Sequence, residues 1–486
     1  NCIQCNRCAY VCPHAVIRPV ALTAEEVANA PEGMKTLDLT GMKEYKFTMS
    51  VSALDCTGCG SCVNVCPGKK GAKALAMENL EASADEQKYF DYTVKLPVKE
   101  DVIAKFKEAT VKGSQFKQPL LEFSGACAGC GETPYAKLIT QLFGDRMYIA
   151  NATGCSSIWG NSSPSTPYTV NAKGQGPAWS NSLFEDNAEF GYGMLLAQRA
   201  IRDGLKAKVE DVVANGTNED VKAAGQEWLD TFAVGATNGA ATDKLVAALE
   251  ACGCDKAKEI LAQKDFLAKK SQWIFGGDGW AYDIGFGGVD HVLASGRDIN
   301  VMVFDTEVYS NTGGQSSKST PTGAIAQFAA GGKETKKKDM ASIAMSYGYV
   351  YVAQISMGAD FNQTVKAIAE AEAYPGPSLI IAYAPCINHG IKKGMAKAQT
   401  EEELAVKVGY WHNFRFNPAA EGNKFSLDSK APSMEDYQAF LDGEVRYNSL
   451  KRQNPEKAAR LFAKNEAEAK ARFEYLQKLI ALHSAE

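Results

Sequence analysis

The sequence lacks any long apolar run and any excess of positive charge. No uninterrupted apolar stretch approaches the roughly 20 residues that a membrane-spanning helix requires, and no signal peptide opens the chain. Lys and Arg number 52 against 57 Asp and Glu, a formal net charge of -5 that argues against nucleic acid as the main partner. We therefore expect a soluble, cytoplasmic protein that binds neither membranes nor nucleic acid.

The arrangement of the cysteines excludes a disulfide framework. The chain has 14 cysteines, which recur at short, regular spacings typical of metal ligands. Disulfides are moreover rare in a reducing cytosol. With 486 residues, the chain is longer than one hydrophobic core usually supports, so two or more domains are expected.

The N-terminal part contains the pattern C-x2-C-x2-C-x3-C-P twice. The first run is Cys2, Cys5, Cys8 and Cys12, and the second is Cys56, Cys59, Cys62 and Cys66. Three closely spaced thiolates can bind three corners of one 4Fe-4S cubane, while the fourth thiolate reaches the neighbouring cluster. We therefore assign the two clusters to crossed ligand sets, which are Cys2, Cys5, Cys8 and Cys66 for one and Cys56, Cys59, Cys62 and Cys12 for the other. Zinc is usually bound by CxxC pairs and has no use for this doubled pattern.

Residues 1–95 are therefore predicted to form an α+β, ferredoxin-like domain that relays electrons. The residues between the two runs exceed what a minimal two-cluster ferredoxin needs. We expect a short helix from Thr23 to Asn29 and a returning strand from Glu44 to Val51. The polar, Lys-rich residues 96–123 are predicted to be a linker with a short helix from Val102 to Thr110.

The segment from Phe275 to Pro321 predicts a diphosphate site. Its order is strand, a turn at Gly277-Asp278-Gly279, helix, a strand from Asp298 to Phe304, and a polar loop containing Asn311. Small residues let main-chain amides approach phosphate oxygens, and the N-terminus of the following helix favours the same anion. Asp278 can supply a carboxylate oxygen to the Mg²⁺ that a diphosphate needs. The alternative is an ordinary Rossmann-like turn without a cofactor.

A third cluster is predicted beside this site. Cys127, Cys130 and Cys155 supply three ligands, and the fourth is Cys386 or, less favoured by spacing, Cys252 or Cys254. Cys155, Asp278, Asn311 and Cys386 each follow a predicted strand. Because ligands collect at the carboxyl ends of strands in an open α/β sheet, one sheet edge can hold both cluster and cofactor.

The rest of the chain alternates between helices and strands. This alternation predicts that residues 124–440 form a doubly wound, mainly parallel α/β sheet. The expected elements are helices from Lys338 to Tyr347 and from Phe361 to Ala371, and strands from Tyr349 to Ile355 and from Ser378 to Ala384. An Ala- and Lys-rich helical insertion is expected at about 197–270, and helices without chemistry of their own are expected in the tail at 441–486.

Three further features favour structural interpretations. Cys252 and Cys254 are expected to be free thiols on the helical insertion, because a C-x-C pair does not easily form a disulfide with itself. The basic run from Lys333 to Lys338 is expected to be a solvated loop, with steering of an acidic ferredoxin as the alternative. His389 is expected to be a hydrogen-bonded structural histidine, with contact to cofactor or product as the alternative.

The central segment resembles the thiamine diphosphate signature, in which GDG is followed by a loop that carries Asn. The wording DTEVYSNTGGQSSKSTPTGA is similar to that of the pyruvate:ferredoxin oxidoreductases, which have Thr where the generic signature has Asn or Asp; here it is Thr306. The CxxC, TGC and late APC motifs are also similar to that family's, and the resemblance implies Cys386 as the fourth ligand. From Cys2 to about Phe440, the chain resembles the C-terminal part of the single-chain form.

The resemblance implies specific site residues. The Mg²⁺ ligands would be Asp278, Thr306 and the main-chain oxygen of Val308. The residues in contact with thiamine diphosphate would be Glu132, Cys155, Gly277, Asp278, Gly279, Trp280, Thr306, Glu307, Val308, Tyr309, Ser310 and Asn311. Asn311 would reach the substrate, and Glu132 would lie between cluster and cofactor; these two are the catalytic candidates.

The resemblance also implies the reaction. Pyruvate and coenzyme A would be converted to acetyl-CoA and CO₂, with electrons passing singly along three 4Fe-4S clusters to ferredoxin or flavodoxin. The alternatives are an oxidoreductase for another 2-oxoacid (2-oxoglutarate, a branched-chain oxoacid or indolepyruvate) and a pure electron-transfer polyferredoxin. A homodimer is expected. Because Asn1 is not an initiator Met and Cys2 is already a ligand, we expect upstream domains to complete the active site.

Overall fold

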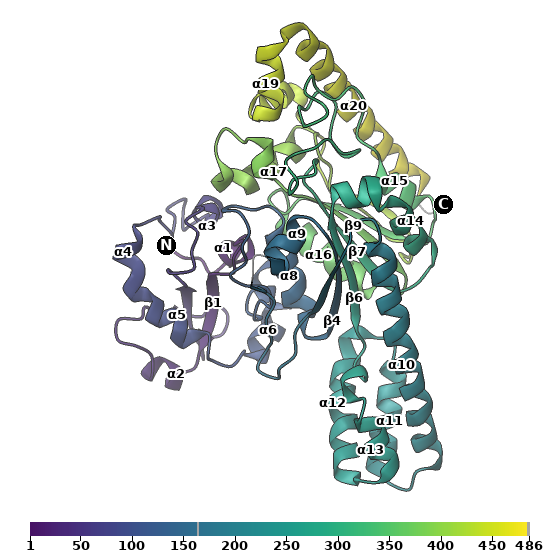
Figure 1. The fold of residues 1–486 in the computed structure, drawn as a ribbon. Helices are drawn as coiled ribbons and strands as arrows, with labels where there is room; N and C mark the ends of the chain where they lie inside the picture. The colour runs from purple at the N-terminus through teal and green to yellow at the C-terminus, as the bar shows by residue number, and fades with distance from the viewer. Residues whose placement is uncertain (163–164, 484–486) are drawn as a thin grey trace.

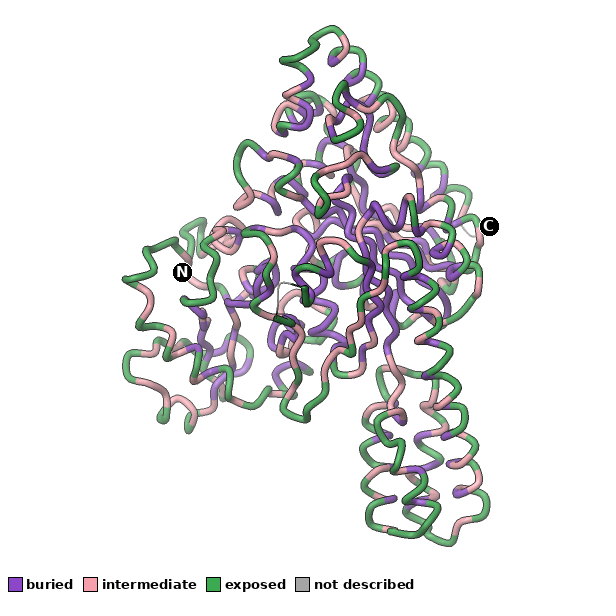
Figure 2. The backbone as a smooth tube through the Cα atoms, viewed as in Figure 1, coloured by how far each residue is buried: buried purple, intermediate pink, exposed green. Residues whose placement is uncertain are grey.

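The computed structural model describes residues 1–162 and 165–483. An N-terminal domain and a helical lobe flank a central sheet, and the C-terminal helices lie on the side of that sheet opposite the lobe (Figure 1). Buried residues concentrate at the central sheet, whereas exposed residues predominate on the outer surfaces of the lobe and of the N-terminal domain (Figure 2). In the part of the chain described, no helix is both long and apolar enough to cross a membrane.

The N-terminal domain is built on a small antiparallel sheet. Its strand order is β1-β3-β2, and the strands are β1 (Ile17–Leu22), β2 (Leu37–Asp38) and β3 (Lys46–Val51). Helix α2 (Ala24–Ala28) begins at a capping box, because Thr23 and Glu26 each accept a hydrogen bond from the other's main-chain N–H. The predicted helix after Thr23 and the predicted returning strand are both confirmed.

The short helices of this domain carry or support the cysteine runs. They are α1 (Arg7–Tyr10), α3 (Ser61–Val65), α4 (Leu80–Ser83) and α5 (Gln87–Thr93). Helices α1 and α3 contact each other and bring the two cysteine runs together. Such proximity is what two clusters with exchanged ligands require.

The segment 96–123 contains a short helix, as predicted, but it also packs on the N-terminal domain, which the prediction of a linker did not include. It contains α6 (Glu100–Phe106) and α7 (Val111–Ser114), so the predicted helix begins and ends earlier than expected. Val102, Ile103 and Phe116 are buried with Phe47 of β3 in one apolar group. The burial of these apolar side chains ties the segment to the N-terminal domain.

The central sheet has eight strands in the order β11-β10-β8-β9-β7-β6-β4-β5. The six strands from β8 to β5 are parallel, and β10 and β11 are antiparallel. They are β4 (Met147–Ala152), β5 (Ala178–Ser182), β6 (Ser271–Gly277), β7 (Ile299–Asp305), β8 (Tyr351–Ile355), β9 (Pro377–Tyr383), β10 (Phe414–Phe416) and β11 (Phe425–Leu427). The predicted mainly parallel α/β sheet is therefore confirmed.

Helices cover both faces of this sheet. Along β7, Val301 and Val303 pack into one apolar core, and Met302 and Phe304 pack into the other. A strand covered on both sides is apolar at every position, which is typical of doubly wound sheets. The covering helices are α8 (Thr133–Phe143), α9 (Cys155–Ser157), α14 (Phe286–Ala294), α15 (Met340–Met345), α16 (Phe361–Ala373) and α17 (Ala398–Lys407).

The turn after β6 differs from the prediction in one respect. The expected helix does not follow the Gly277-Asp278-Gly279 turn directly, because a π-helical segment, Gly279–Ile284, comes first and α14 begins at Phe286. Such short π-helical segments often occur at functional sites.

The helical insertion forms a lobe with its own core. Its helices are α10 (Asn187–Asn215), α11 (Glu219–Thr231), α12 (Gly235–Cys252) and α13 (Asp255–Leu261). The lobe core contains the fully buried Trp228 and Leu245. Helix α10 starts ten residues before the predicted boundary at 197, because its first turns pack on β4 and β6 of the sheet.

The C-terminal residues are helical, as predicted. The helices are α18 (Tyr437–Asp442), α19 (Val445–Gln453) and α20 (Pro455–Leu482). Leu461, Phe462 and Leu476 of α20 are buried in the same core as β7 and β9. The end of the predicted tail, 484–486, lies outside the described residues.

Candidate functional site

The three predicted Mg²⁺ ligands converge where β6 and β7 end. The Thr306 hydroxyl lies 3.0 Å from Asp278 Oδ1 and 3.1 Å from the main-chain oxygen of Val308. Asp278 is fully buried, and Ser317 donates its hydroxyl to Asp278 Oδ2 at 2.6 Å. Oxygen atoms of a carboxylate, a hydroxyl and a carbonyl are the donors that Mg²⁺ prefers.

The buried carboxylates at this corner favour a bound cation. Burial, reinforced by the neighbouring Asp305, raises the pKa of Asp278 well above its ordinary value. A divalent cation in contact with Asp278 would reverse this penalty. Within residues 1–162 and 165–483, no three His, Cys, Asp or Glu side chains gather as ligands of a single ion. A metal at this corner would accordingly depend on the hydroxyl and carbonyl oxygens as well as on Asp278.

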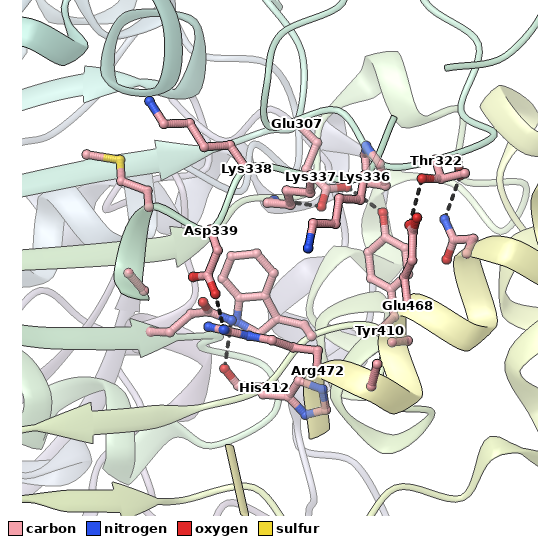
Figure 3. A pocket seen from close by; sticks show the side chains of 18 of the residues that line it. Glu307, Thr322, Lys336, Lys337, Lys338, Asp339, Tyr410, His412, Glu468 and Arg472 are labelled. Carbon is pink, nitrogen blue, oxygen red and sulfur yellow. Dashed lines mark hydrogen bonds and ion pairs between the residues drawn. The ribbon is translucent and has the colours of Figure 1, made fainter. Parts of the chain in front are cut away.

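Behind the corner lies a buried ion network, of which Figure 3 shows Glu307, Lys337 and Tyr410. The Glu307 carboxylate accepts from Lys337 at 2.9 Å, from Arg446 at 2.8 Å and from Tyr410 at 2.6 Å. Burial alone would raise the pKa of Glu307, but Lys337 and Arg446 lower it to about 2. The Glu307 side chain is thus fully engaged, so a cofactor contact from this residue would come from its main chain.

The basic run from Lys333 to Lys338 differs from its sequence prediction as a solvated loop. Lys337 is only partly exposed, and its ammonium bridges Asp305 at 2.8 Å and Glu307 at 2.9 Å. Burial would lower its pKa, but these two carboxylates raise it above the ordinary value. Lys333 donates to the main-chain oxygens of Ser317 and Thr320. The run therefore holds the cofactor loop in place from behind, beside a cavity of about 510 Å³.

The glycines of the turn are required by close packing. A side-chain carbon on Gly279 would lie 2.4 Å from the Tyr309 ring, and one on Gly276 would lie 2.3 Å from the Trp280 indole. At Gly277, by contrast, the nearest atom is a carbonyl oxygen at 3.9 Å. The turn thus leaves space at Gly277 for a ligand to approach the main chain, whereas the Trp280 side chain is buried in the core.

A cavity of about 120 Å³ brings the predicted third cluster and the cofactor loop together. Its lining includes Cys127, Cys130, Cys155 and Cys386 together with Glu132, Thr306 and Asn311. Cys155 Sγ lies 3.1 Å from the hydroxyl of Ser310, and the main-chain N–H of Gly131 donates to the oxygen of Pro385 at 3.2 Å. Four cysteines from three separate segments therefore face one space.

Glu132 is buried in this cavity wall. Its carboxylate accepts from the indole N–H of Trp159 at 2.7 Å. Burial raises the pKa of Glu132 to about 7, although the Trp159 hydrogen bond acts in the opposite direction. Burial, with smaller contributions from Glu132 and Cys127, also raises the pKa of Cys386 to about 11. Thiols in such surroundings need a positively charged partner to ionise, which the iron of a cluster supplies.

The cysteines of the N-terminal domain also lie close together. Burial and then the nearby Cys12 raise the pKa of Cys62 to about 12. Burial followed by Cys62 and Cys5 raises the pKa of Cys8. The two runs thus interleave, and Cys12 lies beside members of the second run. This arrangement is compatible with the crossed ligand sets, which stay a prediction.

The structure also places His389 and the pair Cys252 and Cys254. His389 is fully buried, its Nε2 lies 2.7 Å from the main-chain oxygen of Thr306, and burial lowers its pKa to about 3. The prediction of a hydrogen-bonded structural histidine is confirmed. Cys252 and Cys254 lie at the end of α12, with their sulfur atoms 2.9 Å apart. They do not line the cavity that contains Cys386.

Sequence reasoning missed several residues of the site. Four residues that were not predicted each contact a predicted residue, and none stands at a distinctive spacing: Ser317, Lys337, Trp159 and Arg446. Ser317 and Lys337 lie in segments that the sequence had already singled out, the cofactor loop and the basic run, although neither was assigned this role. The others reach the site through the fold.

Two family models match separate parts of the chain. Residues 1–70 match the family model described as a 4Fe-4S dicluster domain. Residues 233–382 match the model described as thiamine pyrophosphate enzyme, C-terminal TPP binding domain. The matched regions contain both cysteine runs and the segment from Asp278 to Asn311.

Curated relatives match nearly the whole chain. It is 58% identical over 490 residues to a pyruvate-flavodoxin oxidoreductase of Enterobacter agglomerans, covering 99% of this chain and 41% of that protein. It is also 58% identical over 492 residues to the pyruvate:ferredoxin oxidoreductase of Moorella thermoacetica, with the same coverage. A mitochondrial pyruvate dehydrogenase [NADP(+)] of Euglena gracilis is 49% identical over 491 residues, covering 99% of this chain and 27% of that protein. The chain thus spans about two fifths of the first two relatives.

Proposed function

We propose that this chain, which belongs by sequence to the pyruvate:ferredoxin and pyruvate:flavodoxin oxidoreductases, is the cofactor-binding and electron-transfer part of an enzyme that oxidises pyruvate. The reaction converts pyruvate and coenzyme A to acetyl-CoA and CO₂. The electrons leave one at a time through three 4Fe-4S clusters. Both family models and the names of the relatives support this proposal.

The observation that carries the proposal is the cavity shared by four cysteines and the cofactor loop. Cys127, Cys130, Cys155 and Cys386 line it together with Thr306 and Asn311. A cluster held there would lie next to the thiamine site, so an electron could pass between them without a mobile carrier. A polyferredoxin with a vestigial α/β domain has no need for this shared space.

In this proposal, different residues of the chain bind the metal, the diphosphate and the substrate. Asp278, Thr306 and the Val308 carbonyl would hold Mg²⁺, and the open main chain at Gly277 would receive the diphosphate. When bound, thiamine diphosphate supplies the electron sink for loss of CO₂ from a 2-oxoacid. Asn311 is exposed at the cavity, where its amide can orient the substrate carboxylate.

The acceptor of the electrons is proposed to be ferredoxin or flavodoxin, as the names of the relatives indicate. A cytoplasmic homodimer is part of the same proposal. We also place the coenzyme A site, and the carboxylate that activates the thiamine, in the portion of the longer relatives that this chain does not span.

The test is the cofactor content of the anaerobically purified protein. Three cubanes correspond to about 12 Fe per chain, with stoichiometric thiamine diphosphate. Cys155→Ser should remove the cluster beside the thiamine and leave about 8 Fe, whereas Cys254→Ser should leave all three clusters. An absence of thiamine would favour the polyferredoxin, and a Cys155→Ser protein with three clusters would refute the ligand assignment.

The substrate is tested separately. Turnover of pyruvate, 2-oxoglutarate, branched-chain oxoacids and indolepyruvate should be compared in the holoenzyme with a one-electron dye. Pyruvate is expected to give the highest kcat/KM. A clear preference for another oxoacid would leave the proposed mechanism intact and would show that pyruvate is not the substrate.

A further inference from the structure

A lysine is buried between the two parts of the molecule that carry the clusters. Lys137, on α8, is only 2% exposed. Its ammonium donates to the main-chain oxygen of Ala9 on α1, and lies 3.3 Å from the Gln115 side-chain oxygen. Gln115 is in turn held by Gln141 at 2.9 Å. The ammonium therefore has neutral partners in a water-poor pocket.

The position of Lys137 along α8 places it on the electron path. The helix begins at Thr133, directly after Glu132 and three residues after the predicted ligand Cys130. Lys137 lies one turn further, where its ammonium reaches Ala9 of α1. Ala9 itself follows Cys8 and lies three residues before Cys12, predicted ligands of two different clusters. One helix thus connects the cavity beside the thiamine to the N-terminal domain.

No carboxylate accounts for this charge. Among the ion pairs of residues 1–162 and 165–483, none includes Lys137. Nearby Arg18 adds positive charge and is itself paired with Glu122. Burial lowers the pKa of Lys137 to about 8, and the Cys12 and Cys8 thiols act in the opposite direction. An unpaired buried ammonium is unfavourable unless a negative group lies nearby.

A 4Fe-4S cluster with four thiolate ligands is such a negative group. Its net charge becomes more negative on reduction, so a nearby cation stabilises the reduced form and raises the reduction potential. We propose that Lys137 is a positioning residue for electron transfer, whose buried charge raises the potentials of the two clusters of the N-terminal domain, most for the cluster that Cys12 ligates. This inference rests on the proposed function, because it requires those clusters to be present.

The consequence is directional transfer. Raising the potential of the clusters in the N-terminal domain above that of the cluster beside the thiamine favours movement of each electron away from the active site. The hydrogen bond from Lys137 to Ala9 also joins the helix that follows Cys130 to the segment between Cys8 and Cys12. The charge of Lys137 and its hydrogen bond to Ala9 therefore both act where α8 meets the N-terminal domain.

The experiment is a potentiometric titration of the holoenzyme, followed by EPR of the reduced clusters. Lys137→Gln keeps a hydrogen-bond donor without the charge, Lys137→Met removes both, and Lys137→Arg keeps the charge. We expect the Gln and Met variants to lower the potential of the Cys12 cluster by about a tenfold change in its reduced-to-oxidised ratio, about 59 mV for a one-electron couple. Lys137→Arg should stay close to the unsubstituted protein.

Lys112 provides a matched control. It is half-buried and its ammonium lies 3.8 Å from the centre of the Phe106 ring, near Cys2 and Cys5 of one predicted set only. Lys112→Met should therefore affect the other N-terminal cluster and leave the Cys12 cluster unchanged.

Unchanged potentials in iron-replete Lys137→Gln and Lys137→Met proteins would overturn the inference while leaving the proposed function intact. An equal shift in Lys137→Arg, or loss of the clusters in all three variants, would also overturn it, because the role would then be structural. Absence of the N-terminal clusters from the unsubstituted holoenzyme would defeat both the inference and the proposed function.

Discussion

At the scale of single residues, Asp278 is the position of the candidate site at which we expect a substitution to have the largest effect on cofactor binding. It is fully buried and meets Thr306 and Ser317 through its two oxygens. Asp278→Ala should abolish Mg²⁺-dependent binding of thiamine diphosphate, because the metal loses its charged ligand. Isothermal titration of the cofactor-free protein with thiamine diphosphate, with and without Mg²⁺, would measure this loss.

The control for Asp278 is another carboxylate of the same region. Asp290 on α14 is only partly buried and accepts a hydrogen bond from Tyr347. Asp290→Asn should bind the cofactor normally. Undiminished affinity in Asp278→Ala would show that the turn after β6 does not hold the metal.

Lys337 supports the site by pairing with two buried carboxylates, without a predicted contact with the cofactor. Lys337→Met would leave Asp305 and Glu307 buried with one fewer cation, and it should lower the free energy of unfolding by about 3–5 kcal/mol. The adjacent Lys336 is exposed and belongs to none of the ion pairs of the described residues. Lys336→Met should change stability by less than about 0.5 kcal/mol. Similar denaturant midpoints for the two variants would contradict the buried network.

At the scale of elements, the docking of α20 should depend on pH. His412 is 2% exposed and stacks on Phe473 of α20 with ring centres 5.7 Å apart. Burial, then Arg472, lowers the pKa of His412 to about 4. Because the folded pKa lies below the unfolded value of about 6.5, the neutral form is favoured in the fold. Its contribution to stability is therefore complete above about 6.5 and declines as pH falls towards about 4.

The measurement is urea unfolding between these pH values. His412→Gln should flatten part of the decline, since Gln does not titrate, and His389, which is also held neutral in the fold, accounts for a further part. A variant with the same pH dependence as the unsubstituted protein would rule out His412 as a contributor.

The helical lobe should be energetically separable from the site. Trp228 of α11 is fully buried in the lobe core and donates to the main-chain oxygen of Leu267 at 3.2 Å. Trp228→Ala should destabilise the lobe by about 3–5 kcal/mol and accelerate hydrogen exchange in α11 and α12. The iron and thiamine contents should not change, because the lobe has its own core. Loss of the cofactor in this variant would show that the lobe and the site are coupled.

At the scale of the whole molecule, the chain should hold the cofactors without completing the reaction. The relatives with which it shares 58% identity are more than twice as long as the matched segment. Residues 1–486 prepared alone should bind their clusters and yet give no coenzyme A-dependent oxidation of pyruvate. Adding the remaining portion of a longer relative should restore turnover. Oxidation of pyruvate by residues 1–486 alone would contradict this expectation.

Much of the architecture could be predicted from the sequence. The parallel sheet, the helical insertion and the strand after Glu44 follow from periodicity that repeats within a few residues. The segment 96–123 was misjudged because its Lys-rich surface masks three buried apolar side chains, Val102, Ile103 and Phe116. The π-helical segment after Asp278 was missed because an extra residue per turn leaves no mark in composition.

The sequence by itself determined which chemistry the chain is built for. Cluster ligands three or four positions apart, and a GDG turn followed by Asn311, are local patterns, because each ligand group is positioned by a short piece of backbone. Only the tertiary structure decided how the charges around those ligands are arranged. Lys137 reaches Ala9 across 128 residues of sequence, and Arg446 reaches Glu307 from the far end of the domain. Burial of a charge depends on everything packed around it, and no local pattern records that environment.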